Sequence, residues 1–138
     1  MSSGVAVNDQ CLEVFEELKL RKKYKYIIFK LSDDNKEIVI EKSSTNGEYQ
    51  EFLDELPPSE PRYAVFDFEF EKGAEGKRNK ITFYTWIPDT SKIRQKMLYA
   101  SSKDALRRKL VGIAVEIQGT DASEVAYETV LDKASRTS

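Results

Sequence analysis

Two apolar stretches separated by a glycine-containing turn constrain the fold of this chain more than any other feature. The first has large apolar residues at every second position, namely Ala64, Phe66, Phe68 and Phe70. Such alternation is typical of a β-strand with one face in the core. The second stretch, residues 81–86, is apolar on both faces, which favours a central place in a sheet. Because residues 71–77 between them contain two glycines, the pair predicts a hairpin.

The remaining chain predicts further strands and the helices that cover the sheet. Residues 24–31 and 37–42 are expected to be strands joined by a polar turn, and residues 114–118 a short strand. Asn8 or Asp9 is a suitable cap for a helix to about Leu20, with its inner side formed by Leu12, Phe15 and Leu18 or Lys19. Residues 49–56 fit a short helix that two prolines stop.

Two more helices are expected in the second half of the chain. Asp89, Thr90 or Ser91 is a suitable cap for a long helix to about Leu110, which Gly112 ends. Asp121 with Glu124 resembles a capping box that starts a last helix through about residue 133. Together these elements predict a mixed sheet of about five strands covered by helices.

Length and composition place the chain among single-domain proteins. We expect residues 1–7 to be a mobile tail and residues 8–138 to be one domain. The absence of histidine removes the usual general base and the usual zinc ligand, and the single Cys11, expected to be buried, forms no internal disulfide. The sequence therefore predicts a non-enzymatic protein without metal or cofactor. With no secretory signal or apolar run long enough to span a bilayer, we expect it in the cytoplasm.

Charge is unevenly distributed along the chain. Residues 77–110 contain ten lysines and arginines against two aspartates, a net charge of +8, whereas the rest carries −10. A basic segment in an acidic protein predicts a partner with an acidic surface, which leaves protein, anionic lipid and nucleic acid open. Lys77, Arg78 and Lys80 either extend this basic area or keep a sheet edge soluble.

The long predicted helix carries one stripe that should face solvent. Spacings of three and four residues place five side chains on one side, within an arc of about 80°: Arg94, Met97, Ser101, Asp104 and Arg108. The opposite side, with Tyr99, Leu106 and Leu110, suits burial against the sheet. From residue types alone the stripe is either a solvated helix surface or a protein interface in which Met97 supplies the apolar contact.

Six segments, in order, resemble the actin-depolymerising factor/cofilin family, with the fungal and amoeboid members most similar. They are Gly4–Val7, Arg62–Glu69, Gly76–Ile81, Trp86–Asp89, Lys96–Arg108 and Gln118–Val125. The resemblance covers the whole chain. It implies the actin-depolymerising factor homology fold, a single-domain α/β structure of the α+β type, in which a mixed five- to six-stranded sheet is flanked by four or five helices.

The resemblance also implies an activity and two binding surfaces. The protein would bind monomeric and filamentous actin, prefer the ADP state, and promote filament severing and depolymerisation. The surface for both actin forms would contain Ser3, Gly4, Val5, Arg94, Lys96, Met97, Asp104, Arg107 and Arg108. A second surface, for filaments, would contain Arg78, Lys80, Asp132, Lys133 and Arg136.

Regulation and location follow from the same resemblance. Ser3 matches the family's regulatory phosphorylation position, and the basic residues of both surfaces resemble its phosphoinositide-binding set, where lipid would compete with actin. We expect a monomer at the actin cytoskeleton, in patches or at the cortex, with nuclear entry left open. Because the chain has no histidine, pH-dependent severing would not originate from one here.

Two alternatives remain at this point. A nucleic-acid-binding module is suggested by the +8 segment with nearby Phe83, Tyr84 and Trp86, although Asp104 within the stripe and the strand-like alternation of the rings argue against it. The alternative nearer to the main interpretation is a member of the same family that binds actin or phosphoinositide without severing filaments.

Overall fold

The computed structural model describes residues 4–136 as six strands and five helices. The strands are β1 (Ala6–Val7), β2 (Tyr26–Leu31), β3 (Glu37–Ser44), β4 (Arg62–Glu71), β5 (Lys77–Trp86) and β6 (Val115–Gly119). The helices are α1 (Asp9–Arg21), α2 (Tyr49–Asp54), α3 (Ile93–Arg107), α4 (Ala122–Val125) and α5 (Tyr127–Arg136). A 3₁₀ turn, Gly73–Glu75, connects β4 to β5.

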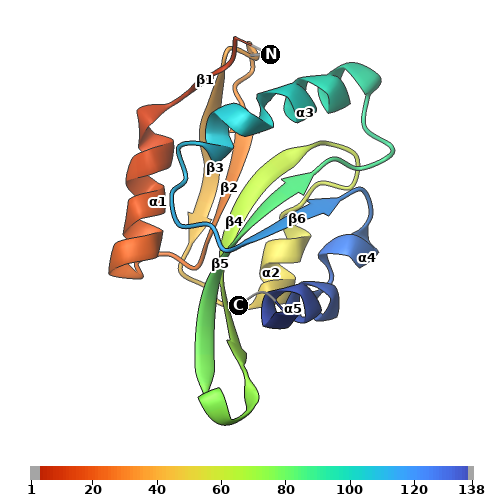
Figure 1. Ribbon diagram of the computed structural model, residues 1–138. Coiled ribbons are helices and arrows are strands. Elements are labelled where there is room, and N and C mark those ends of the chain that lie inside the picture. Colours follow the sequence, from red (N-terminus) through yellow and green to blue (C-terminus); the bar gives the residue numbers. More distant parts are fainter. Residues whose placement is uncertain (1–3, 137–138) are drawn as a thin grey trace.

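All six strands form one mixed sheet in the order β1-β3-β2-β4-β5-β6. The β1–β3 and β5–β6 pairs are parallel, and the other pairs are antiparallel. Helices α1 and α3 cover one face, and α2, α4 and α5 cover the other (Figure 1). The predicted mixed sheet between helices is confirmed, with six strands rather than about five.

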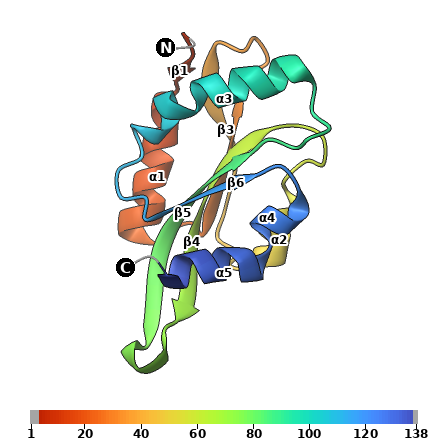
Figure 2. The same cartoon turned by 45° about the vertical axis from the view of Figure 1, so that its right-hand side comes forward.

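The alternation seen in the sequence divides the core into two clusters. On β4, Phe66, Phe68 and Phe70 pack toward α2, α4 and α5, whereas Tyr63 and Val65 pack toward α1 and α3. The central strands are therefore buried on both faces. The distal part of the β4–β5 hairpin extends beyond both helical layers (Figures 1 and 2), so its side chains near the tip are exposed.

Two predictions for the N-terminal region need correction. Ala6 and Val7, expected in the mobile tail, form β1, and the Ala6 N–H donates to the Lys36 carbonyl oxygen at 3.0 Å. Asn8 caps α1 as predicted, but Leu12 is 38% exposed and Cys11 takes the inner position. The reason is helical geometry, because positions 11, 15 and 18 lie on the sheet side and position 12 is turned away by about 100°.

The beginning of the long helix also differs from the prediction. Helix α3 begins after Lys92, whose side chain makes no capping hydrogen bond. The chain first turns at Pro88, where the Ser91 N–H donates to the Pro88 carbonyl oxygen at 3.0 Å, so regular helix starts only beyond the three predicted caps. The helix ends at Arg107 rather than at about Leu110.

The predicted last helix is divided into α4 and α5. Asp121 caps α4 as expected, accepting from the backbone N–H groups of Ser123 and Glu124. Ala126 is extended (φ −61°, ψ 149°) and interrupts the helix. The Tyr49 hydroxyl donates to the Val125 carbonyl oxygen at 2.7 Å and so occupies an acceptor that a continuous helix would use. Among residues 4–136, no helix combines the length and apolar character needed to cross a membrane.

Candidate functional site

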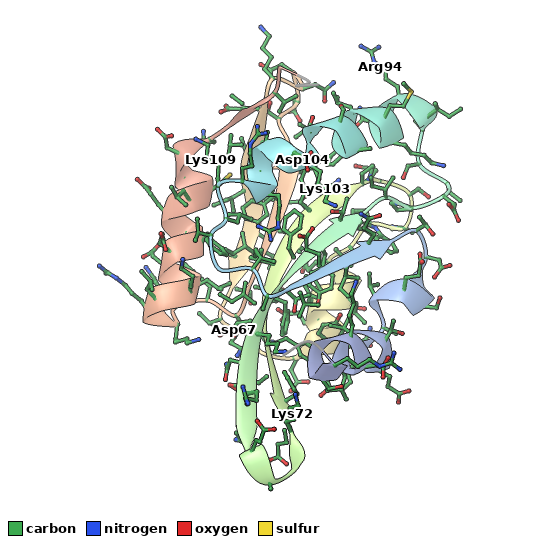
Figure 3. All side chains as sticks on the ribbon, viewed as in Figure 1. Asp67, Lys72, Arg94, Lys103, Asp104 and Lys109 are labelled. Atoms are coloured by element: carbon green, nitrogen blue, oxygen red, sulfur yellow. The ribbon has the colours of Figure 1, made fainter. Side chains whose placement is uncertain are left out.

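The outward face of α3 carries the stripe predicted from the sequence. Its members Arg94, Met97, Ser101, Asp104 and Arg108 are all exposed. Met97 is 66% exposed, and Figure 3 shows Arg94 pointing away from the body of the molecule. Ile93, which the sequence analysis did not single out, is 74% exposed at the start of the helix. Ile93 and Met97 are therefore two large apolar side chains that are exposed to solvent among polar and basic groups.

The buried side of α3 holds this face in place. Tyr99 and Leu106 pack in the core, as predicted. The Tyr63 hydroxyl donates to the Tyr99 carbonyl oxygen, and the Leu31 N–H donates to the Tyr99 hydroxyl at 2.9 Å. Burial raises the pKa of the Tyr99 hydroxyl, which therefore stays neutral. Helix α3 is thus attached to β4 and β2 independently of its outward residues.

The N-terminal segment lies beside α3. Val5 is buried in the same cluster as Tyr99 and Leu106, and β1 contacts α3. Gly4, at φ +80°, adopts a backbone conformation that favours glycine. The structure thus brings Gly4 and Val5 next to the helix, whereas Ser3 lies outside the described residues.

Lys96 and Arg107 lie at the flanks of the stripe, where both are half-buried. The Arg107 Nε donates to Glu116 Oε2 at 3.0 Å, and its Nη1 donates to the Leu110 carbonyl oxygen at 3.3 Å. Lys103 pairs with the same Glu116 at 3.7 Å. Arg107 is therefore directed toward β6 and is already bound to Glu116 and to the Leu110 carbonyl oxygen.

The second predicted set also comes together in space. The Lys80 Nζ on β5 donates to the Ala134 carbonyl oxygen on α5 at 2.9 Å, which joins the hairpin to the last helix. Arg78 pairs with Glu75 at the tip, and this arginine holds the pKa of the Glu75 carboxyl below its usual value. Burial, with the charges of nearby cations, lowers the pKa of Lys80.

Helix α5 contributes the rest of this second set. The Lys133 Nζ donates to the Glu116 carbonyl oxygen at 2.7 Å, and Arg136 pairs with Asp132 at 3.2 Å. Asp132, Lys133 and Arg136 are all exposed. Figures 1 and 2 place this region at the opposite end of the molecule from α3. The described residues of the two predicted sets thus lie mainly at two ends of the molecule, and they meet at Glu116, which both Arg107 and Lys133 contact.

Asp67 is a structurally important residue that the sequence analysis missed. Its side chain is 1% exposed and lies at the root of the β4–β5 hairpin (Figure 3). Its carboxylate is 3.3 Å from Lys22 Nζ and 3.9 Å from Lys25 Nζ, and it accepts from Asn79 Nδ2 at 3.2 Å. The available signal was an aspartate on the same strand face as the core residues Tyr63 and Val65, because a buried charge requires partners.

The aromatic residues that suggested nucleic-acid binding are in the core. Phe83 and Tyr84 are fully buried, and the Trp86 indole N–H donates to the Pro57 carbonyl oxygen at 2.7 Å. With Phe83 and Tyr84 inaccessible and Trp86 only 6% exposed, the basic segment lacks the set of stacking rings on which that alternative depends.

Comparison with known proteins gives the same family throughout the chain. The family model described as cofilin/tropomyosin-type actin-binding protein matches residues 4–135. Cofilin of Mycosarcoma maydis is 64% identical over 136 residues, which cover 99% of this chain and 98% of that protein. Cofilin of Saccharomyces cerevisiae is 56% identical over 135 residues, covering 97% and 94%.

Solved structures agree with the sequence comparisons. The crystal structure of Streptomyces griseoflavus cofilin matches with a TM-score of 0.92 and 61% identity, over 98% of this chain and 100% of that one. Plasmodium berghei actin depolymerization factor 2 matches with a TM-score of 0.86 and 32% identity, over 99% and 100%. The fold, the exposed α3 face and these matches agree: the chain belongs to the cofilin/tropomyosin-type family of actin-binding proteins.

Proposed function

We propose that this protein binds monomeric and filamentous actin, prefers the ADP state, and promotes filament severing and depolymerisation. The observation that carries the proposal is the outward face of α3, where exposed Ile93 and Met97 lie among basic and polar groups on a helix fixed from behind. An apolar centre with a polar rim is the usual composition of a protein interface. Family membership supports actin as the partner.

Two separated surfaces allow one molecule to contact two neighbouring subunits of a filament. The first contains Gly4, Val5 and the outward residues of α3 with its flanks, together with Ser3. The second contains the hairpin and α5 residues, among them Arg78 and Lys80. A protein that contacts two subunits stabilises whichever filament twist suits both contacts. Binding energy would thereby weaken the contacts between subunits, which is how severing would follow without any bond being broken.

Two regulatory inputs act on the same surfaces. Phosphorylation of Ser3 would add about −1.5 to −2 charge to a surface whose other members include Arg94 and Lys96, and would oppose binding to an acidic partner. Phosphoinositide headgroups would compete for the basic residues of both surfaces. In this proposal the protein acts as a monomer in the cytoplasm, at the actin cytoskeleton.

Co-sedimentation with filamentous actin, followed by imaging of filament length, tests the proposal. The expected result is pelleting with filaments and a shift toward shorter filaments. Failure to pellet would overturn actin binding. Pelleting without shortening would identify a relative that binds filaments but does not sever them.

A further inference from the structure

A groove lies between α2 and α4, across the end of β5. Its floor consists of the buried side chains of Leu56, Trp86 and Val125, and α2 contributes Leu53 to its wall. The cavity has a volume of about 740 Å³. Ligand sites in proteins usually occupy about 300–1,000 Å³, so this groove accommodates several side chains. None of its lining residues belongs to either proposed actin-binding surface.

The rim of this groove is acidic. Asp54 at the end of α2, Asp89 after β5 and Asp121 before α4 are exposed members of the lining. No lysine or arginine is among the lining residues, and within residues 4–136 none of these three carboxylates forms an ion pair. A hydrogen bond from the Ser123 hydroxyl lowers the pKa of Asp121 below its ordinary value and keeps it ionised at neutral pH. Three negatively charged carboxylates thus line a groove with an apolar floor, and no lysine or arginine among residues 4–136 pairs with them.

The charge of the rim and the shape of the groove together define which kind of ligand it can bind. We infer that the groove binds a segment of a partner protein in which lysine or arginine flanks a large apolar side chain. The apolar side chain would cover Trp86 and Val125, and the flanking cations would reach the carboxylates, which are complementary in charge. Asp54 lies on α2 at one wall of the groove, whereas Asp89 and Asp121 lie on adjacent segments, where the Asp89 N–H donates to the Thr120 carbonyl oxygen at 3.2 Å. The occupant must therefore carry cations on both sides of its apolar group. An extended peptide segment meets that requirement.

Trp86 provides a direct reporter, since it is the single tryptophan of the chain. The protein, without actin, is titrated with hexapeptides that have leucine, methionine or phenylalanine at the centre and lysine or arginine on both sides. We expect saturable changes in Trp86 fluorescence and in its indole N–H resonance, weakened by added salt. Matched peptides with a central serine, or with flanking glutamates, should produce no saturable change.

Substitution of the rim tests the charge argument. Asp54→Asn with Asp89→Asn and Asp121→Asn should weaken peptide binding at least about tenfold. Asparagine caps helices about as well as aspartate, so α4 should persist. The matched control removes the same charge at exposed sites elsewhere: Glu13→Gln, Asp33→Asn and Glu128→Gln.

Three results would overturn the inference. They are the absence of saturable binding by any basic peptide up to about 1 mM, equal binding by the rim and control variants, and displacement of bound peptide by monomeric actin. The last would assign the groove to the actin-binding surface instead. If the triple variant unfolds in a thermal scan, the single variant Asp89→Asn replaces it in the peptide-binding assay. Within residues 4–136 the Asp89 carboxylate accepts no hydrogen bond, so this substitution should leave the fold intact.

Discussion

The two candidate actin-binding surfaces differ in how their side chains are held. On the outward face of α3, the charged ends of Arg94 and Arg108 form no ion pair within residues 4–136. On the hairpin and α5, Lys80 and Lys133 donate to backbone carbonyl oxygens, and Arg78 pairs with Glu75. The outward face of α3 therefore presents cations without ion-pair partners, although Arg107 at its flank is bound to Glu116, and the second surface consists mainly of side chains already bound inside the protein.

This difference predicts unequal contributions to binding. A partner of the α3 face gains new contacts, whereas a partner of the second surface must exchange existing contacts for intermolecular ones, which reduces the net gain for each residue. The second surface should therefore contribute less to the affinity for actin, and its internal contacts should contribute to the stability of the fold.

Loss of the α3 surface should have the largest effect. Arg94→Ala with Lys96→Ala should weaken both monomer and filament binding roughly hundredfold, because truncation of central interface residues commonly costs about 2 kcal/mol or more. Affinities would be measured by co-sedimentation and by titration of labelled monomeric actin. Arg21→Ala with Lys23→Ala removes the same charge from the end of α1 and should leave both affinities unchanged. Intact monomer binding by the α3 variant would contradict the assignment.

The contacts between α3 and the sheet should contribute measurably to the free energy of unfolding. Tyr99→Phe leaves the buried Leu31 N–H without the acceptor it has at 2.9 Å, which should lower the free energy of unfolding by about 1–3 kcal/mol. Urea denaturation measures this change. Tyr127→Phe, at a 44% exposed tyrosine, is the control and should change it little. If Tyr99→Phe is as stable as the unaltered protein, α3 is not held through this contact.

The second surface should affect filaments selectively. Arg78→Ala with Lys80→Ala should weaken filament binding roughly tenfold and leave monomer binding unchanged. Loss of the hydrogen bond from Lys80 to Ala134 should also lower the free energy of unfolding by about 1 kcal/mol. The two binding assays measure the changes in affinity, and urea denaturation measures the change in the free energy of unfolding. An equal loss in the two binding assays would refute the separation into two surfaces.

A charge at Ser3 should have a smaller effect on the first surface. Ser3→Asp adds one negative charge to the N-terminal segment that approaches α3, and should weaken monomer and filament binding by roughly threefold to tenfold. Ser3→Ala should bind as the unaltered protein does. Full filament binding by Ser3→Asp in co-sedimentation would exclude this form of regulation.

The smallest effect is expected from pH near neutrality. The chain has no histidine, so the free energy of unfolding should be nearly constant from about pH 6 to 8. Hydrogen bonds lower the pKa of Glu51, Glu75 and Glu124 below the ordinary value of 4.5. A carboxyl with a lowered folded pKa stabilises the protein above its unfolded pKa and loses that contribution as pH falls through the folded value.

Urea midpoints measured across pH should therefore be flat at neutral pH and fall below about pH 4.5. In the same range Arg78 should lose its Glu75 partner, and the hairpin tip should become more mobile in amide exchange, while the α3 face remains protected. A marked loss of stability between pH 8 and 6 would contradict this expectation.

Much of this protein could be predicted from local patterns. Alternating apolar residues predicted β4, and a run that is apolar on both faces predicted β5. Spacings of three and four residues identified the exposed stripe of α3, because helix periodicity determines which side chains share a face. Element ends were less predictable. The start of α3 and the break at Ala126 depend on the turn at Pro88 and on a hydrogen bond from distant Tyr49.

The residue types, the uneven charge and the faces of β4, β5 and α3 follow from the sequence, since these depend on neighbours within a few positions. The burial of Asp67 among Lys22, Lys25 and Asn79, and the contact of Arg107 with Glu116, arise from the folded arrangement of distant segments. The same tertiary structure also brought together three separated aspartates around one groove. The physical reason is that such pairings join residues far apart in the chain, and no local period encodes which of them meet.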